Sequence, residues 1–251
     1  MRADLPKRYI RTLHYIINAQ IELKDLKSAR TNIKYMRELP GQPGFAGLNI
    51  EAQVFVASTL GELRLLDRSG EHSKAIALTP EAIHGMEQLG ERLHKEHELE
   101  FYFTFACVHF GCGEMNKALF WLNKVLNDNE PTLRQDIFTY ARLFNLVIHY
   151  ELGNYDLLEY IVRSTQRFLN KRQRADGMEN VLMDHIKKLS RMSDPSGKRE
   201  LFQSMRSKFE ALLNDPNESL VLKYFDVISW VNAHIDGVPF SEVVRRQVPV
   251  K

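Results

Sequence analysis

Apolar residues recur at spacings of three and four along most of the chain, which is the pattern of amphipathic α-helices. Four such stretches are each followed by a short turn and a second helical stretch. The turns lie at Lys24, Gly70, Gly113 and Gly153, which are 46, 43 and 40 residues apart. The pattern therefore predicts an all-α fold in which a unit of helix, tight turn and helix occurs about four times.

The turns carry the residues that such a hairpin needs. Glycine adopts the left-handed conformation that ends a helix without steric cost. Five residues after the turn, Ala29, Ala75 and Ala118 provide a small side chain that lets two antiparallel helices approach closely, while Leu158 stands there in the fourth unit. Lys24 occupies the glycine position of the first unit, so we expect strain or a different helix end there.

The third unit has the most specific pattern. It reads YFTFACVHFGCGEMNKALFWLNKVL, with Tyr102, Ala106, Phe110, Gly113, Ala118 and Leu122 at its key positions. This order of large, small, aromatic, glycine, alanine and large apolar residues resembles a tetratricopeptide repeat (TPR). The resemblance covers roughly residues 7–172 and is only partial in the second and fourth units. The spacings exceed the 34 residues of that family, and the fourth unit lacks the alanine.

The resemblance implies a right-handed α-α superhelix, a TPR-like solenoid in which each hairpin stacks on the next. Residues 40–48, PGQPGFAGL, should form a loop between the first two units, because proline and glycine interrupt helices. Thr79 followed by Pro80 is the pattern of a helix start, so we expect the second helix of the second unit to break and restart there.

Beyond about residue 175 the repeat fades, although helical patterns continue. Three stretches, ENVLMDHIKKLSRM, KRELFQSMRSKFEALLND and ESLVLKYFDVISWVNAHI, are followed by the short segment FSEVVRRQ. Solenoids need a terminal element that covers their last repeat. We therefore divide the chain into helical repeats over residues 1–175 and a C-terminal helical cap over residues 176–251, continuous with the repeats.

Composition sets broad limits on the class of protein. Of 251 residues, 44% are apolar and 26% are charged, which is ordinary for a folded, soluble chain. The sequence contains neither an apolar run long enough to span a membrane nor an apolar signal core, so we expect a cytoplasmic protein. Cys107 and Cys112 are the only cysteines, and both lie in an apolar stretch that predicts buried free thiols.

Each motif with catalytic or metal-binding potential has a plainer explanation. His94 and His97 could share a helix face and bind a metal, but no third ligand accompanies them and they lie in a charged segment. His109 and His149 occupy equivalent repeat positions, which favours a structural role. The stretch DPSGK lacks the remaining residues of a phosphate loop and reads as a turn between helices. The sequence therefore predicts a protein without catalytic activity, cofactor or metal.

The TPR resemblance implies a concave surface lined by the first helix of each unit, where a peptide can bind. Mapped through the repeat, the inward-facing candidates are Arg11, His14, Asn18, Arg64, Arg68, Phe103, Phe110, Tyr140 and Tyr150. Arginine and aromatic residues dominate binding energy at interfaces, so these residues predict a groove for a peptide with an acidic and an apolar part. For Phe103 and Phe110, a place in the core between helices is an equal alternative. Arg64 and Arg68 are expected to be exposed and to contribute little to folding.

Charge is unevenly distributed. Residues 161–251 contain 16 basic and 11 acidic residues, whereas the whole chain has a net charge of only +2. Most of the excess lies in a basic patch formed by Arg163, Arg167, Lys171, Arg172 and Arg174. The patch could bind nucleic acid or an acidic peptide, but a solvated helix face fits the low overall charge better.

The function predicted from the sequence is therefore a non-catalytic protein-interaction module, a scaffold or adaptor that binds a peptide or partner protein in its groove. The alternatives are a peptide-responsive regulator and a nucleic-acid-binding protein that acts through its basic C-terminal half. A pocket for a lipid or small molecule, lined by residues 101–113, also remains open.

Overall fold

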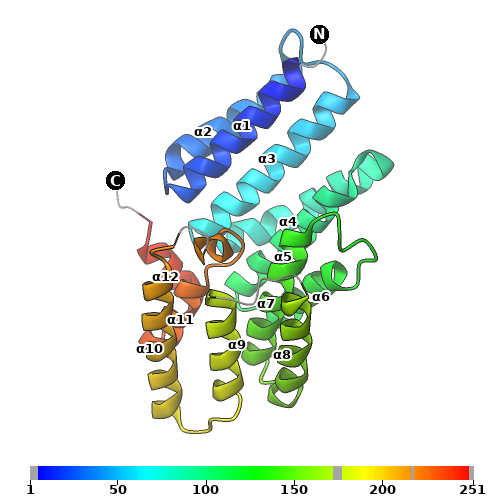
Figure 1. Ribbon diagram of the computed structural model, residues 1–251. Helices are drawn as coiled ribbons and strands as arrows, with labels where there is room; N and C mark the ends of the chain where they lie inside the picture. The colour runs from blue at the N-terminus through cyan, green and yellow to red at the C-terminus, as the bar shows by residue number, and fades with distance from the viewer. Residues whose placement is uncertain (1–4, 172–176, 216–217, 249–251) are drawn as a thin grey trace. The chain divides into compact units, whose positions relative to one another are not determined.

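The computed structural model describes residues 5–171, 177–215 and 218–248 (Figure 1). Within these ranges the regular secondary structure consists of twelve α-helices and three short 3-10 helices, without a strand. The predicted all-α fold is confirmed. None of the helices in the described ranges combines the length and apolar character needed to cross a membrane.

The helices group into two compact units. Unit 1 contains Met1–Cys112 and Val244–Lys251, and unit 2 contains Gly113–Val243. The division falls within the third predicted hairpin, at its turn. The predicted boundary near residue 175 lies outside the described residues and stays a prediction.

Unit 1 contains five helices that pack in chain order. They are α1 (Leu5–Glu22), α2 (Leu26–Glu38), α3 (Leu48–Arg68), α4 (His72–Leu89) and α5 (Lys95–Gly111). Helix α1 packs on α2 and α3, and α3 packs on α4 and α5. Helix α2 also contacts α3, and α4 contacts α5. In the first two hairpins, the first helix (α1 or α3) thus contacts its own partner and the first helix of the next hairpin (Figure 1).

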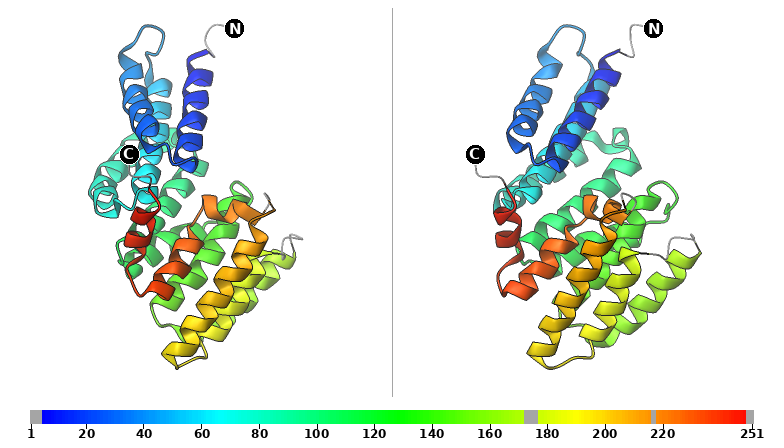
Figure 2. Two further views of the ribbon diagram at one scale, coloured as in Figure 1. Left: turned by 90° about the vertical axis from the view of Figure 1, so that its left-hand side faces the viewer. Right: turned by 60° about the vertical axis from the view of Figure 1, so that its left-hand side comes forward.

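Unit 2 repeats part of this contact pattern. Its helices are α6 (Met115–Leu126), α7 (Gln135–Glu151), α8 (Tyr155–Asn170), α9 (Met178–Leu189), α10 (Pro195–Leu212) and α11 (Val227–Asp236). Helix α7 packs on α6, α8 and α9, and α9 also packs on α8 and α10. Figure 2 shows α9 and α10 as an antiparallel pair joined by a short turn. A short helix, α12 (Phe240–Arg246), contains the point where the chain passes from unit 2 back to unit 1.

The predicted turns share one backbone conformation. Lys24, Gly70, Gly113 and Gly153 all have φ between 59° and 77°, in the left-handed region. Around Lys24 the amide of Asp25 donates to the carbonyl of Gln20, and the amide of Lys24 donates to the carbonyl of Ile21. The same pair of hydrogen bonds occurs at Gly70 and Gly153, so these helices end in Schellman motifs. The expectation of strain at Lys24 is confirmed, because it is the one non-glycine residue with positive φ in the described ranges.

The position five residues after each turn is fully buried in all four units, at Ala29, Ala75, Ala118 and Leu158. Burial of a small side chain at the same place in three hairpins supports the packing argument made from the sequence. The fourth unit buries a larger leucine there. The loop predicted over residues 40–48 is also confirmed, with a 3-10 turn at Leu39–Gly41 and α3 starting at its end.

Two predictions about helix boundaries are wrong. Helix α4 runs without interruption through Pro80. Proline removes one backbone donor, and the hydroxyl of Thr79 donates to the carbonyl of Ala75 in this segment, 3.1 Å away. Helix α4 packs on α3 and α5, and it buries residues both before Pro80 (Ala75) and after it (Ala82).

The third C-terminal stretch is likewise not one helix, because it divides into a 3-10 helix (Glu218–Lys223) and α11. Asp226 caps the start of α11 by accepting hydrogen bonds from the backbone amide and hydroxyl of Ser229, at 3.0 and 2.6 Å. A side-chain cap of this kind fixes a helix start at the residue that carries it.

Candidate functional site

Three of the predicted groove residues come together in unit 1. The amide nitrogen of Asn18 lies 3.0 Å from Nε2 of His14, one turn earlier on α1. Arg64 of α3 donates to the side-chain oxygen of Asn18 at 3.3 Å and forms an ion pair with Glu100 of α5. The second carboxylate oxygen of Glu100 lies 3.4 Å from Nδ1 of His97. We call these five residues the polar row.

The helix packing explains why the polar row forms. His14 and Asn18 are four residues apart and therefore lie on one face of α1. Helix α3 packs on both α1 and α5, so a long arginine side chain near the end of α3 reaches both neighbours. The polar row thus crosses the first helices of three successive hairpins. Sequence reasoning found its members on α1 and α3 but missed Glu100 and His97.

Burial determines the electrostatics of the polar row. Glu100 is only 8% exposed, while the side chain of Arg64 is 32% exposed. Burial lowers the pKa of His14 below its usual value of 6.5, and the positive charge of Arg64 lowers the pKa further. His14 is therefore held in its neutral form beside the guanidinium group. Glu100 provides the negative charge that allows Arg64 to be partly buried.

Two further predicted residues flank the polar row. Arg11 is exposed on α1, one turn before His14. Arg68 is half-buried, one turn after Arg64, and lies close enough to Cys107 for its charge to act on the thiol. Burial nevertheless raises the pKa of Cys107 well above its usual value. Asp67 also acts on Cys107 and raises its pKa further, so the named charges around the polar row are three arginines, Arg11, Arg64 and Arg68, against two acids, Asp67 and Glu100.

The four aromatic candidates are buried: Phe103, Phe110, Tyr140 and Tyr150. Tyr140 stacks on Tyr224 within unit 2, with ring centroids 4.1 Å apart. Their burial assigns these side chains to the core, the alternative that the sequence left open for the two phenylalanines. The physical reason is that α5 and α7 are apolar on nearly every face, which is typical of helices surrounded by protein. The prediction that the ligand has an apolar part therefore has no support from these residues.

One arginine of the basic patch is paired with an acidic residue next to the patch. Arg163 pairs with Glu159, four residues earlier on α8, and Arg191 of α9 lies 3.2 Å from the same carboxylate. Arg167 and Lys171 are exposed. The other two members, Arg172 and Arg174, lie outside the described residues.

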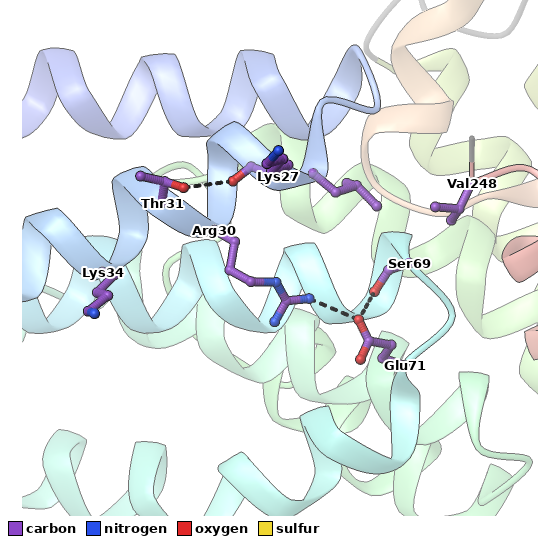
Figure 3. Close-up of a pocket in the computed structure, with 8 residues that line it drawn as sticks. Lys27, Arg30, Thr31, Lys34, Ser69, Glu71 and Val248 are labelled. Atoms are coloured by element: carbon purple, nitrogen blue, oxygen red, sulfur yellow. Dashed lines mark hydrogen bonds and ion pairs between the residues drawn. The ribbon is translucent and has the colours of Figure 1, made fainter. Parts of the chain in front are cut away.

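A second basic cluster, which sequence reasoning missed, lines a hollow of about 730 Å³ in unit 1 (Figure 3). We call it the basic hollow. Lys27, Arg30 and Lys34 lie along one face of α2, and Ser69 and Glu71 face them from the turn between α3 and α4. Arg30 reaches across to Glu71 at 2.9 Å. The signal in the sequence was the spacing of three and four between the basic residues of α2.

The histidines and cysteines fit structural roles. Within the described ranges, no group of three His, Cys, Asp or Glu side chains could hold a metal ion. His109 is buried, and Asn154 lies within hydrogen-bond distance of His149 at 3.1 Å. Neither cysteine forms a disulfide; Cys107 is buried as predicted, whereas Cys112 is only half-buried.

The DPSGK motif starts a helix. Asp194 accepts a hydrogen bond from the backbone amide of Gly197 at 2.7 Å, and Pro195 is the first residue of α10. An aspartate cap followed by proline is a strong helix start. The predicted turn between helices is confirmed.

Fold and site together define an all-α protein of successive helical hairpins whose first three hairpins share a polar row. Over 125 residues the chain is 27% identical to CCR4-NOT transcription complex subunit 10-A of Xenopus laevis. This stretch is 48% of the chain but only 15% of that subunit, so the chain spans a small part of its relative's length. No protein-family model matches the chain, and no solved structure matches it.

Proposed function

We propose that the chain is a TPR-like, right-handed helical superhelix that acts as a non-catalytic protein-interaction module. The contact pattern of the helices supports this proposal, since α1 packs on α3 and α3 on α5 in unit 1, and α7 packs on α9 in unit 2. The shared left-handed turns support it as well. The similar Xenopus protein is named as a subunit of a complex, which agrees with a role in protein assembly.

The observation that carries the proposal is the polar row. Side chains from three successive first helices meet at one surface, as they must where an array of hairpins binds an extended segment. Arg11 is exposed, and about a third of the Arg64 side chain remains accessible beside Glu100. Positive charge exceeds negative charge there, so we propose that the ligand is an acidic segment of a partner protein.

Arg11 and His97 offer the best test because both are exposed enough to be replaced without opening the core. We expect Arg11→Glu with His97→Ala to lower the yield of captured partner at least about tenfold, since the reversed charge at Arg11 repels an acidic segment and the lost imidazole at His97 removes a polar contact. Lys27→Glu with Thr31→Ala is the matched control: it introduces the same two residues, one in place of a basic residue, at exposed positions of the basic hollow on α2.

Affinity capture from the native host, followed by quantitative mass spectrometry, measures the effect. Far-UV circular dichroism of both double variants checks that the helices are retained. Equal recovery of the same proteins by the wild type and the Arg11/His97 variant would rule out the polar row as the binding surface. Loss of binding only in the control variant would place the partner at the basic hollow.

A further inference from the structure

Helix α1 carries a second apolar stripe that faces away from the core. Leu5, Tyr9, Ile16 and Leu23 are 62%, 43%, 44% and 81% exposed. Leu23 follows the last residue of α1, and its backbone amide still donates to the carbonyl of Ala19. With the exposed positions Thr12 and Ala19 included, the spacing alternates strictly between four and three residues. We call these six residues the outer stripe.

Apart from Tyr9, whose side chain also contacts Tyr35 and Phe45, the outer stripe is separate from the surfaces that already have partners. Helix α1 packs on α2 and α3 through a different set of residues, namely Ile10, Leu13, Ile17 and Ile21. The polar row occupies a third face. Alternation of four and three is the period of a helix that pairs with another helix along a seam. Large apolar side chains exposed in such a row mark an interaction surface.

We propose that the outer stripe binds a second copy of this chain, with the two α1 helices antiparallel. A twofold axis near residue 14 places each stripe residue before the axis against a stripe residue after the axis on the other copy. The resulting layers are Leu5 with Leu23, Tyr9 with Ala19, and Thr12 with Ile16. Two of the three layers place a large side chain against a small one, which lets two helices interdigitate closely. The stripe is self-complementary, as a twofold interface requires.

The charges beside the outer stripe select the same orientation. Arg8 and Glu22 are exposed next to opposite ends of the stripe, and neither forms an ion pair within the described residues. Antiparallel pairing brings Arg8 of one copy near Glu22 of the other, twice by symmetry. Parallel pairing would instead leave Arg8 and Glu22 at opposite ends of the helix pair, too far apart to interact. Tyr15, which is also exposed, lies on the same side near the axis, where the two copies of its ring meet.

Tyr9 is already held in place for such a contact. Its hydroxyl donates to the hydroxyl of Tyr35 at 3.2 Å, and its ring lies edge-on to Phe45 at 5.6 Å. A side chain that is fixed before binding loses less conformational entropy in the complex.

Sedimentation velocity between about 1 and 100 µM tests the pairing, a range in which interfaces of small buried area assemble. We expect the wild type to shift with concentration toward twice its mass of 29.2 kDa. Ile16→Asp should weaken dimerisation at least about tenfold, because it places a charge in the central layers. Leu157→Asp is the control, since Leu157 is exposed to a similar extent on α8. Circular dichroism checks the folding of both variants.

A charge exchange tests the orientation. Glu22→Arg alone should weaken the dimer, and adding Arg8→Glu should restore it, because each copy again presents opposite charges to the other. A wild type that stays monomeric throughout, or an Ile16→Asp variant that dimerises like the wild type, would overturn the proposal. Failure of the second charge change to restore the dimer would overturn the antiparallel arrangement.

Discussion

Replacement of Arg64 by methionine separates the charge of this residue from its packing. Methionine retains an unbranched apolar stem of similar length, so contacts along α3 are largely preserved. The guanidinium group is lost, and Glu100 is left 8% exposed without its arginine partner, with Nδ1 of His97 3.4 Å from its carboxylate. From the sequence, Arg64 was expected to contribute little to folding. The structure predicts a clear loss of stability instead.

The size of the loss follows from burial. Removing one partner of a fully buried ion pair costs about 3–5 kcal/mol, because the remaining charge is desolvated and unpaired. Arg64 is 32% exposed, so solvent screens part of the interaction and the expected loss is smaller. We expect Arg64→Met to lower the free energy of unfolding by about 2 kcal/mol. Adding Glu100→Gln should recover about 1 kcal/mol, because the buried charge is removed as well.

Urea denaturation followed by far-UV circular dichroism measures these changes, since the signal reports on helices in both units. Arg30→Met is the matched control, because Arg30 is exposed and pairs with Glu71 at the surface. It should cost no more than about 0.5 kcal/mol. If Arg64→Met is no more destabilising than Arg30→Met, the account of a partly buried charge pair is wrong.

Three further changes test the turns, the core and the titrating groups, each by urea denaturation. Lys24→Gly should raise the free energy of unfolding by roughly 0.5–1 kcal/mol, because glycine adopts the left-handed turn without strain; an unchanged or lower value would contradict this. Gly111→Ala should lower it by about 1–3 kcal/mol, since the added methyl group would overlap the buried ring of His72, and a neutral result would show that the ring can move. The pKa of His14 is lowered in the folded state, so the unfolded chain binds more protons once the pH falls below about 6.5. Stability is therefore present above that pH and falls below it; His14→Gln should flatten this fall, and an identical pH profile would exclude the contribution of His14.

Local backbone chemistry made the hairpins predictable from the sequence. Glycine spacing located the turns, and the position of Lys24 predicted a strained turn that the structure contains. The helix break predicted at Pro80 was wrong, because tertiary packing outweighed the local preference of proline and the helix continued. A local rule therefore predicts a turn well and a helix interruption less well when both sides of the helix are packed.

The candidate site was predictable only in part. Mapping through the repeat placed His14, Asn18 and Arg64 on first helices, and these three residues do meet. Glu100 pairs with Arg64 from 36 residues away, and local sequence gives no measure of such a long-range pairing. The aromatic candidates are buried for a different reason. Their side chains were expected to point into the groove, but the helices that carry them are apolar on nearly all faces. Periodicity identifies a buried face only when the opposite face is polar.

Hydrogen exchange on the chain bound to a captured partner tests the central claim most directly. The account predicts that binding slows amide exchange around the polar row, in residues 7–18 of α1, 60–68 of α3 and 95–104 of α5. Protection in these three segments together, and unchanged exchange in residues 27–34 of α2, is the expected result. Protection that appears in α2 and leaves α1, α3 and α5 unchanged would contradict the claim that the polar row binds the partner.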